Sequence, residues 1–259
     1  MEDAVLRRPD RDGIAWLTLN RPEARNALSL ALMEALTAEL ARLAEDPATK
    51  VVVLAGAGPG FCAGHDLREL RANPGRQFIE TTFASCSRLM LAITRLPKPV
   101  IVQVHGVATA AGCQLVATCD LAIAAETARF ATPGVNIGLF CSTPMVALSR
   151  AVGRKPAMEM LLTGDLVSAD RAREIGLVNR VMPQAGLDAE VTRLAGQIAA
   201  KSPLTLSIGK EAFYRQAEME LEAAYSYASE VMTRNMMARD AAEGIDAFLA
   251  KRAPVWSGT

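Results

Sequence analysis

The hydrophobic pattern in the first part of the chain alternates between that of strands and that of helices. Residues 13–22 alternate apolar and polar side chains, which predicts a strand with Ile14, Trp16 and Leu17 or Leu19 turned inward. Residues 29–46 repeat an apolar side chain every three or four positions after Ser29, which predicts an amphipathic helix capped by that serine. Residues 50–56 are continuously apolar, as expected of a strand buried on both faces.

The same alternation continues to about residue 143. A glycine-rich loop at 56–64 is followed by a helical pattern at 77–96 and by three more strand patterns, at 99–106, 120–125 and 129–132. Short helical segments come next. We therefore expect an α/β fold, because buried strands alternate with helices.

The chain from Pro203 onward is almost wholly helical. We expect a core formed by residues 1–200 and a helical region formed by residues 201–259. Apolar side chains recur at helical spacing between Leu221 and Met236. A region of this length cannot bury all of these apolar side chains by itself. It should therefore pack on the core or on another subunit.

Composition and charge exclude several classes of function. The chain has 259 residues, with 28 basic and 28 acidic side chains, so its net charge gives no attraction to nucleic acid or to an anionic membrane. Five cysteines without a CxxC pair indicate reduced thiols, and two histidines without zinc-type spacing indicate that no metal is bound. A charged N-terminus and the lack of a membrane-length apolar run favour a cytoplasmic location.

The glycine-rich loop does not match a nucleotide-binding motif. Its glycines are spaced G-x-G-x-G rather than G-x-G-x-x-G, and Pro59 removes a backbone N–H that a phosphate would need. The chain also lacks G-x-x-x-x-G-K-[ST] and G-x-S-x-G, so P-loop and α/β-hydrolase functions lose their central element.

Five segments in this order resemble the enoyl-CoA hydratase/isomerase family, also called the crotonase family. They read LNRPEARNAL (19–28), FCAGHDLREL (61–70), HGVATAAGCQLVATCD (105–120), LTGDLVSADRAREIGLVNRVMP (162–183) and AFLAKR (247–252). The resemblance implies a spiral of ββα units followed by a C-terminal helical region that mediates trimerisation, with trimers often paired into hexamers. It implies an acyl-CoA thioester as substrate, with coenzyme A entering as part of that substrate and no separate cofactor.

The resemblance also implies where the substrate binds. Two backbone N–H groups, of His65 and Ala111, would form an oxyanion hole that stabilises a thioester enolate. The glycine common at the second position is alanine here, but any residue except proline supplies an N–H. The implied substrate-binding positions are Ala24, Arg25, Ala63, Asp66, Leu67, Arg68 and Gly112, with Phe248 and Lys251 reaching the CoA of a neighbouring subunit. The family often has lysine where this chain has Glu23, so Arg25 or Arg68 would supply the cation for phosphate.

Both glutamates that hydratases of this family use are absent. Their positions are occupied by Gln114 and Gly134, and an amide cannot exchange a proton near neutral pH. Addition of water needs a proton delivered and a proton removed, so we do not expect efficient hydration. Gly134 should leave a gap where the second carboxylate would reach. Cys141 follows in a loop that supplies catalytic side chains in other members, and is a candidate for replacing them.

Three functions remain open from the sequence. The first is an enzyme that stabilises a thioester enolate and then decarboxylates, isomerises or hydrolyses its substrate; decarboxylation is attractive because loss of CO₂ forms the enolate without a base. The second is an acyl-CoA-binding protein with negligible turnover. The third is a true hydratase with substitute acid and base groups.

Overall fold

The central element of the fold is a six-stranded sheet in a computed structural model that describes residues 5–259. β1 pairs antiparallel with β2, and the other neighbouring strands run parallel. In order of pairing, the strands are β1 (Val5–Arg11), β2 (Ile14–Leu19), β3 (Val51–Gly56), β4 (Val100–Val104), β6 (Leu121–Ala125) and β9 (Arg180–Met182). Parallel neighbours need crossover connections, and helices provide them. The predicted α/β class is confirmed.

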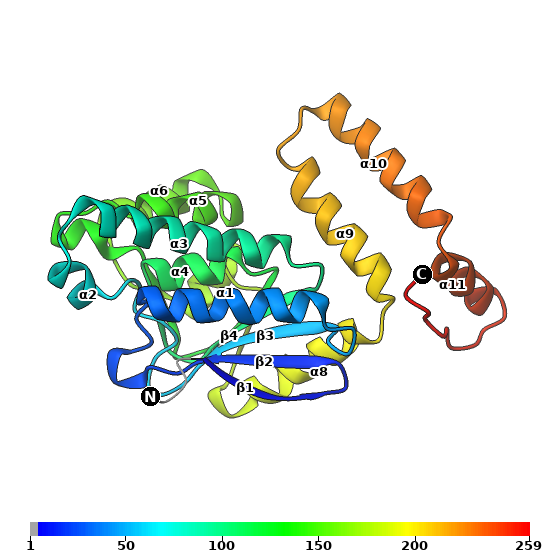
Figure 1. The fold of residues 1–259 in the computed structure, drawn as a ribbon, viewed down its shortest axis with the longest axis horizontal. Helices are drawn as coiled ribbons and strands as arrows, with labels where there is room; N and C mark the ends of the chain where they lie inside the picture. The colour runs from blue at the N-terminus through cyan, green and yellow to red at the C-terminus, as the bar shows by residue number, and fades with distance from the viewer. Residues whose placement is uncertain (1–4) are drawn as a thin grey trace.

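Helices cover both faces of this sheet (Figure 1). One layer contains α1 (Leu30–Glu45), α3 (Arg76–Arg95) and α4 (Ala111–Thr118), and α8 (Leu187–Ala199) lies on the opposite face. Leu17 and Leu19 of β2 join the core cluster beneath α1, whereas Ile14 and Trp16 join the cluster that includes α8. The side chains predicted to turn inward are all buried, but on two opposite faces, because helices cover both sides of β2.

A second, three-stranded sheet leads the chain into α4. It contains β5 (Val107–Thr109), β7 (Arg129–Ala131) and β8 (Val167–Ser168), with β7 in the middle. The sequence predicted β7 but neither β5 nor β8. Since β5 ends two residues before α4 begins, the small sheet determines where that helix starts.

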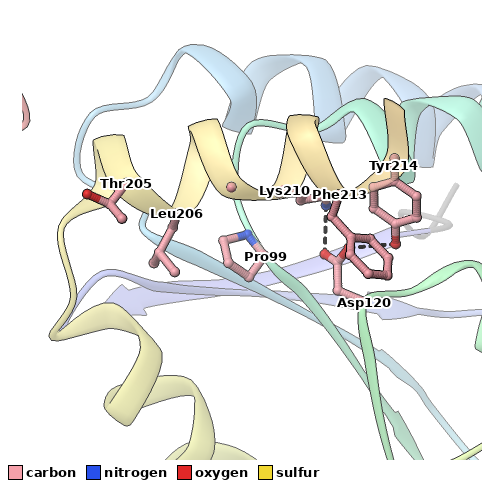
Figure 2. Close-up of a pocket in the computed structure, with 8 residues that line it drawn as sticks. Pro99, Asp120, Thr205, Leu206, Lys210, Phe213 and Tyr214 are labelled. Atoms are coloured by element: carbon pink, nitrogen blue, oxygen red, sulfur yellow. Dashed lines mark hydrogen bonds and ion pairs between the residues drawn. The ribbon is translucent and has the colours of Figure 1, made fainter. Parts of the chain in front are cut away.

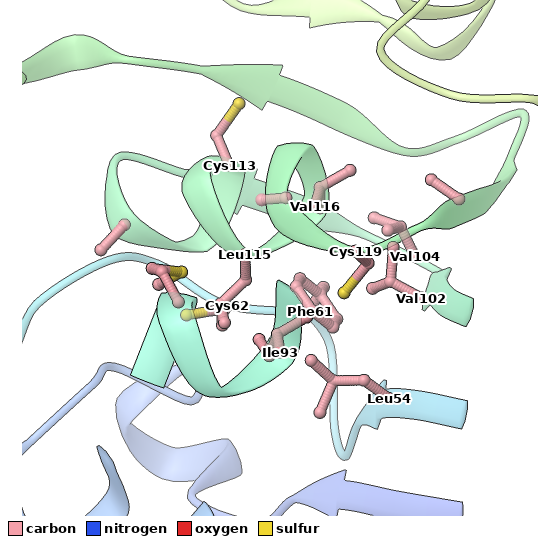
Figure 3. Packing of buried hydrophobic residues seen from close by; sticks show 14 of the residues in the cluster. Leu54, Phe61, Cys62, Ile93, Val102, Val104, Cys113, Leu115, Val116 and Cys119 are labelled. Carbon is pink, nitrogen blue, oxygen red and sulfur yellow. The ribbon is translucent and has the colours of Figure 1, made fainter. Parts of the chain in front are cut away.

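The helix α4 lies inside the core rather than on the surface. Figure 3 shows Leu115 and Val116 of α4 among Phe61, Ile93 and Val102, which come from a loop, a helix and a strand. Such packing on several sides fixes the position of the helix and of its N-terminus.

The other helices before residue 200 are short and link these layers. The cap predicted for α1 is confirmed, because the Ser29 hydroxyl accepts the Leu32 N–H at 3.2 Å. The remaining segments are α2 (Leu67–Ala72), α5 (Ser142–Ala151), α6 (Arg154–Thr163), α7 (Ala169–Glu174) and the 3₁₀ turns η1 (Pro22–Ala24), η2 (Pro133–Ile137) and η3 (Gln184–Gly186).

Three C-terminal helices extend away from the sheet (Figure 1). They are α9 (Pro203–Gln216), α10 (Leu221–Met236) and α11 (Arg239–Leu249). Their apolar side chains remain accessible: Tyr225 is 70% exposed and Phe248 is 83% exposed. Within the described part of the chain, no helix has both the length and the apolar character needed to cross a bilayer.

A buried ion pair attaches α9 to the end of the sheet (Figure 2). Lys210 is 7% exposed in its side chain, and its Nζ lies 2.7 Å from Asp120 Oδ2. Tyr214 donates its hydroxyl to Asp120 Oδ1 at 2.8 Å, and burial together with this carboxylate raises the pKa of Tyr214. These contacts line a small pocket of about 290 Å³ and hold α9 beside the core.

Candidate active site

The segment that contains His65 is held in an extended conformation beside residue 28. Leu28 donates its N–H to the Gly64 carbonyl at 2.7 Å, and Asp66 donates its N–H to the Leu28 carbonyl at 3.0 Å. In extended backbone, successive N–H groups point to opposite sides. The His65 N–H therefore faces away from residue 28.

Ala111 supplies the first N–H of α4. The first N–H groups of a helix have no carbonyl acceptor within their own helix, and the helix dipole makes this end attractive to negative charge. The preceding residue, Ala110, has a φ of 50°, which turns the chain sharply from β5 into α4. Position 112 must be glycine, because a β-carbon there would lie 2.1 Å from the Cys62 carbonyl oxygen.

Close packing at Gly64 brings these two segments together. A β-carbon at Gly64 would lie 2.9 Å from the Ala110 β-carbon and 3.4 Å from the Ala111 nitrogen. Gly64 also has a φ of 99°, which L side chains rarely adopt. The structure thus places Gly64, the residue before His65, against the start of α4.

Gln114 lies one turn further along α4 and is 5% exposed. Its Oε1 lies 3.7 Å from the Cys86 sulfur, which can donate a weak hydrogen bond. Gln114 also lines a pocket of about 810 Å³ bounded by α3, α5 and α9. Leu91, Ala117 and Val146 supply apolar wall, and Glu211 and Arg150 add charged groups. The arrangement suits an apolar chain that ends near Gln114.

The gap expected beside Gly134 does not exist. Gly134 lies in η2, where its N–H is directed at the Cys141 sulfur over 3.3 Å. A β-carbon at position 134 would lie 2.9 Å from that sulfur and 2.7 Å from the Leu139 carbonyl oxygen. The thiol and the loop backbone have closed the space, so this expectation from the sequence is wrong.

Burial shifts the pKa values of the titratable groups around α4 away from neutrality. It lowers the pKa of His65 to about 4 and raises the pKa values of Cys86 and Cys113 to about 12. It also raises the pKa of Cys141, against the opposing effect of the Gly134 N–H. The His65 ring packs edge-on against Phe83 at 5.2 Å, and its buried Nε2 has no hydrogen-bond partner among the described residues. An imidazole with a pKa of about 4 is a weak base, and thiols with pKa values of about 12 are weak acids, so these groups move protons poorly at pH 7.

The expected CoA positions near the N-terminus form one surface. Ala63 donates its N–H to the Arg25 carbonyl at 3.0 Å, which joins the segments of residues 24–25 and 63–68. Arg25, Ala63, Leu67 and Arg68 are exposed and Ala24 is partly exposed, so a ligand can reach them.

Asp66 differs from these positions because it has structural partners. Its carboxylate caps α2 and pairs with Arg21 at 2.9 Å. Burial alone would raise its pKa, but the bonds from Arg21 and from the helix N-terminus bring the net shift below the usual range. Asp66 therefore shapes the surface and has little freedom to contact a phosphate.

Phe248 and Lys251 are not brought to this site within one chain. Phe248 lies in the last turn of α11 and Lys251 follows its end, and Figure 1 places α11 far from α4. Two other residues were not anticipated from the sequence: Glu211, a carboxylate in the pocket that Gln114 lines, and Asn26, whose buried amide holds the glycine-rich loop. The sequence offered only one signal for Asn26, namely an amide side chain directly before the apolar residues Ala27 and Leu28.

Comparison with known proteins identifies relatives of this chain. A family model described as enoyl-CoA hydratase/isomerase matches residues 10–259. The human enoyl-CoA hydratase domain-containing protein 3, mitochondrial, is 49% identical over 95% of this chain and 81% of its own. The 2,3-dehydroadipyl-CoA hydratase of Escherichia coli K12 is 35% identical over the full length of both chains. A crystal structure of an enoyl-CoA hydratase from Mycobacterium smegmatis is 55% identical with a TM-score of 0.96, covering 98% of this chain and 99% of that one.

These matches settle two expectations. The structural likeness confirms the crotonase-type fold. The cytoplasmic location is contradicted, because relatives from rat, mouse and human are named as mitochondrial proteins and point to that compartment instead.

Proposed function

Since this chain belongs to the enoyl-CoA hydratase/isomerase family, we propose that it binds an acyl-CoA thioester and polarises the thioester carbonyl with the N–H groups of His65 and Ala111. The observation that supports this most is the packing of Gly64 against Ala110 and Ala111, which puts both segments at the positive end of α4. The acyl group occupies the pocket that Gln114 lines, and CoA lies along residues 24–25 and 63–68. CoA enters as part of the substrate, with no separate cofactor.

The proposed chemistry is formation of an enolate without a carboxylate base. Gln114 and Gly134 occupy the positions of the two glutamates, and the buried His65 and Cys141 are held neutral. Decarboxylation of a carboxyacyl-CoA fits these groups best, because the bond to CO₂ supplies the electrons of the enolate and no proton has to be removed first. Gln114 then serves as an amide that positions the carboxylate or a water.

A panel of acyl-CoA species tests this proposal. The expected result is release of CO₂ from a carboxyacyl-CoA, detected by product mass, with very slow hydration of crotonyl-CoA. Binding of the whole panel without turnover would instead identify an acyl-CoA-binding protein. A melting series with acyl-CoA, free CoA and NAD is the control, because a ligand that binds the native state raises its stability. Stabilisation by NAD and not by CoA would refute the proposal.

Glu211 supports a second candidate, a true hydratase with a substitute carboxylate. Its side chain lies on α9 and lines the same pocket as Gln114. In that case the unmodified protein hydrates crotonyl-CoA rapidly and Glu211→Gln abolishes the activity. Glu222→Gln, on the exposed start of α10, is the matched control.

The proposed assembly is a trimer or a hexamer. The accessible apolar side chains of α10 and α11, among them Leu221, Tyr225 and Phe248, need a partner surface. In such an assembly Phe248 and Lys251 of one copy approach the CoA bound by another. Sedimentation at micromolar concentration tests this, and a stable monomer would contradict it.

A further inference from the structure

The turn between β2 and α1 contains two consecutive residues in the left-handed region. Arg25 and Asn26 have φ values of 51° and 54°. Side chains other than glycine adopt this conformation at a cost, and it persists only where surrounding contacts impose it. Asparagine tolerates it better than most residues, and here its side chain also makes the contacts that impose it.

The Asn26 amide is fully buried and fully hydrogen-bonded. Its Nδ2 lies 2.8 Å from the Ala57 carbonyl oxygen, 2.9 Å from that of Gly60 and 3.0 Å from that of Phe61. Its Oδ1 accepts the Arg21 N–H at 2.9 Å. An amide has two N–H donors and one acceptor oxygen, and all of them are used here. Asn26 therefore sets the distance between the turn and the loop of residues 57–61.

That loop runs directly into the segment containing His65. Residues on both sides of Asn26 bond to the same segment: the Arg25 carbonyl accepts the Ala63 N–H at 3.0 Å, and the Leu28 N–H is donated to the Gly64 carbonyl at 2.7 Å. Together with Asn26, these contacts attach the turn at three places between residues 57 and 64. Gly64 meets Ala110 and Ala111 on its other side.

The geometry points to Asn26 as a positioning residue for the oxyanion hole. Its amide holds residues 57–61 so that the His65 N–H stays beside the Ala111 N–H. This inference rests on the proposed function, because it assigns Asn26 a role through that hole. Asn26 touches no substrate and acts only through the backbone that it fixes.

The test uses Asn26→Asp, which keeps the size of the side chain and replaces the donor group by an oxygen facing three carbonyls. The probe is an enoyl-CoA thioester with a conjugated aromatic acyl group, whose absorbance moves to longer wavelength when its carbonyl oxygen is polarised. The shift is measured at saturation, so that it is independent of affinity. We expect Asn26→Asp to lose about half of the shift, because one of two donors is displaced. Asn73→Asp is the matched control, since Asn73 Nδ2 bonds only the Glu69 carbonyl at the exposed end of α2.

The outcomes separate this inference from the proposed function. An unmodified protein that binds the probe without a shift would refute the oxyanion hole and this inference with it. A full shift in both the unmodified protein and folded Asn26→Asp would overturn the role of Asn26 alone, because a purely stabilising contact lowers the melting temperature without changing the bound spectrum. If Asn26→Asp does not fold, Asn26→Ser replaces it, because this change also removes the Nδ2 bonds to residues 57–61 but introduces no charge. An undiminished shift in folded Asn26→Ser would then overturn the inference.

Discussion

The sulfur of Cys141 lies 3.3 Å from the backbone nitrogen of Gly134 and takes up the space that a side chain at position 134 would need. Position 134, which the family resemblance assigns to the second glutamate, therefore has no room for a side chain. The Leu139 carbonyl oxygen contributes to the closure, and backbone cannot move aside as a flexible side chain can. Restoring a carboxylate there requires the loop to change.

Gly134→Glu should therefore destabilise the protein. Overpacking a buried site costs about 1–3 kcal/mol, and the new β-carbon would lie 2.7 Å from the Leu139 oxygen. The measurement is the free energy of unfolding from urea titration. Gly196→Ala is the control, because a β-carbon in that helical position meets nothing within 4 Å and should stabilise α8 by roughly 0.5–1 kcal/mol. A Gly134→Glu protein as stable as its parent would contradict the closure.

Gln114→Glu alone should do little for hydration. Acid and base act as a unit, so one carboxylate without its partner should raise the rate with crotonyl-CoA by no more than about tenfold. Burial also raises the pKa of a carboxyl group introduced at such a position. Loss of the enoyl thioester absorbance reports the rate, and Gln77→Glu on the exposed start of α3 is the control. Rapid hydration by Gln114→Glu would show that another group supplies the second proton transfer.

The half-buried imidazole of His65 should make the stability of the protein depend on pH. Its pKa is lowered to about 4 in the folded protein by burial, whereas an unfolded chain takes up the proton near pH 6.5. The unfolded state binds more protons between these values, so stability is lost as pH falls through this window, by about 2 kcal/mol from pH 7.5 to pH 5. In His65→Gln, the free energy of unfolding should no longer fall by this amount between pH 7.5 and pH 5. In the control His105→Gln, the contribution of His65 to the fall should remain. Equal pH profiles for His65→Gln and the unmodified protein would show that the ring is not buried in solution.

Breaking the ion pair that anchors α9 should be costly. Lys210→Met leaves the Asp120 carboxylate without its cation in a largely buried place, and removing one partner of such a pair costs about 3–5 kcal/mol. Arg76→Gln is the comparison, because the Arg76–Glu80 pair lies at 2.7 Å but is exposed, and such pairs contribute about 0–1 kcal/mol. Urea titration of both variants measures the contrast. Equal, small losses would show that α9 does not depend on this contact.

The long elements could be predicted from the sequence because the spacing of their apolar residues matches the faces that they bury. The helix at 30–45 and the strand at 51–56 are buried as their patterns required. The inward-facing side chains of the strand at 14–19 were predicted, but alternation alone did not show that a second layer of helices covers its other face. β5 begins directly after the strand pattern at 99–106 and was not recognised as a separate strand, although it places the start of α4.

The candidate site was predictable where it depends on residue type and order, and unpredictable where it depends on contacts between distant segments. The motif around His65 and the small residues before Gln114 indicated a backbone site. Nothing in the order of residues could show that Cys141 fills the space beside Gly134, because the course of the six residues between them brings the two together. The division near residue 200 and the roles of Phe248 and Lys251 stay predictions.

The close packing of Gly64 and Gly112 should make these two positions respond to mutation differently from the neighbouring positions 65 and 111. The N–H groups at positions 65 and 111 belong to the main chain, so most replacements there preserve them. A replacement at Gly112 would instead push a β-carbon to 2.1 Å from the Cys62 oxygen, and one at Gly64 would push it to 2.9 Å from the Ala110 β-carbon. In a saturation library, the two glycines should tolerate no side chain. Position 65 should accept most residues other than proline, whereas Ala111, which is fully buried, should accept only small ones.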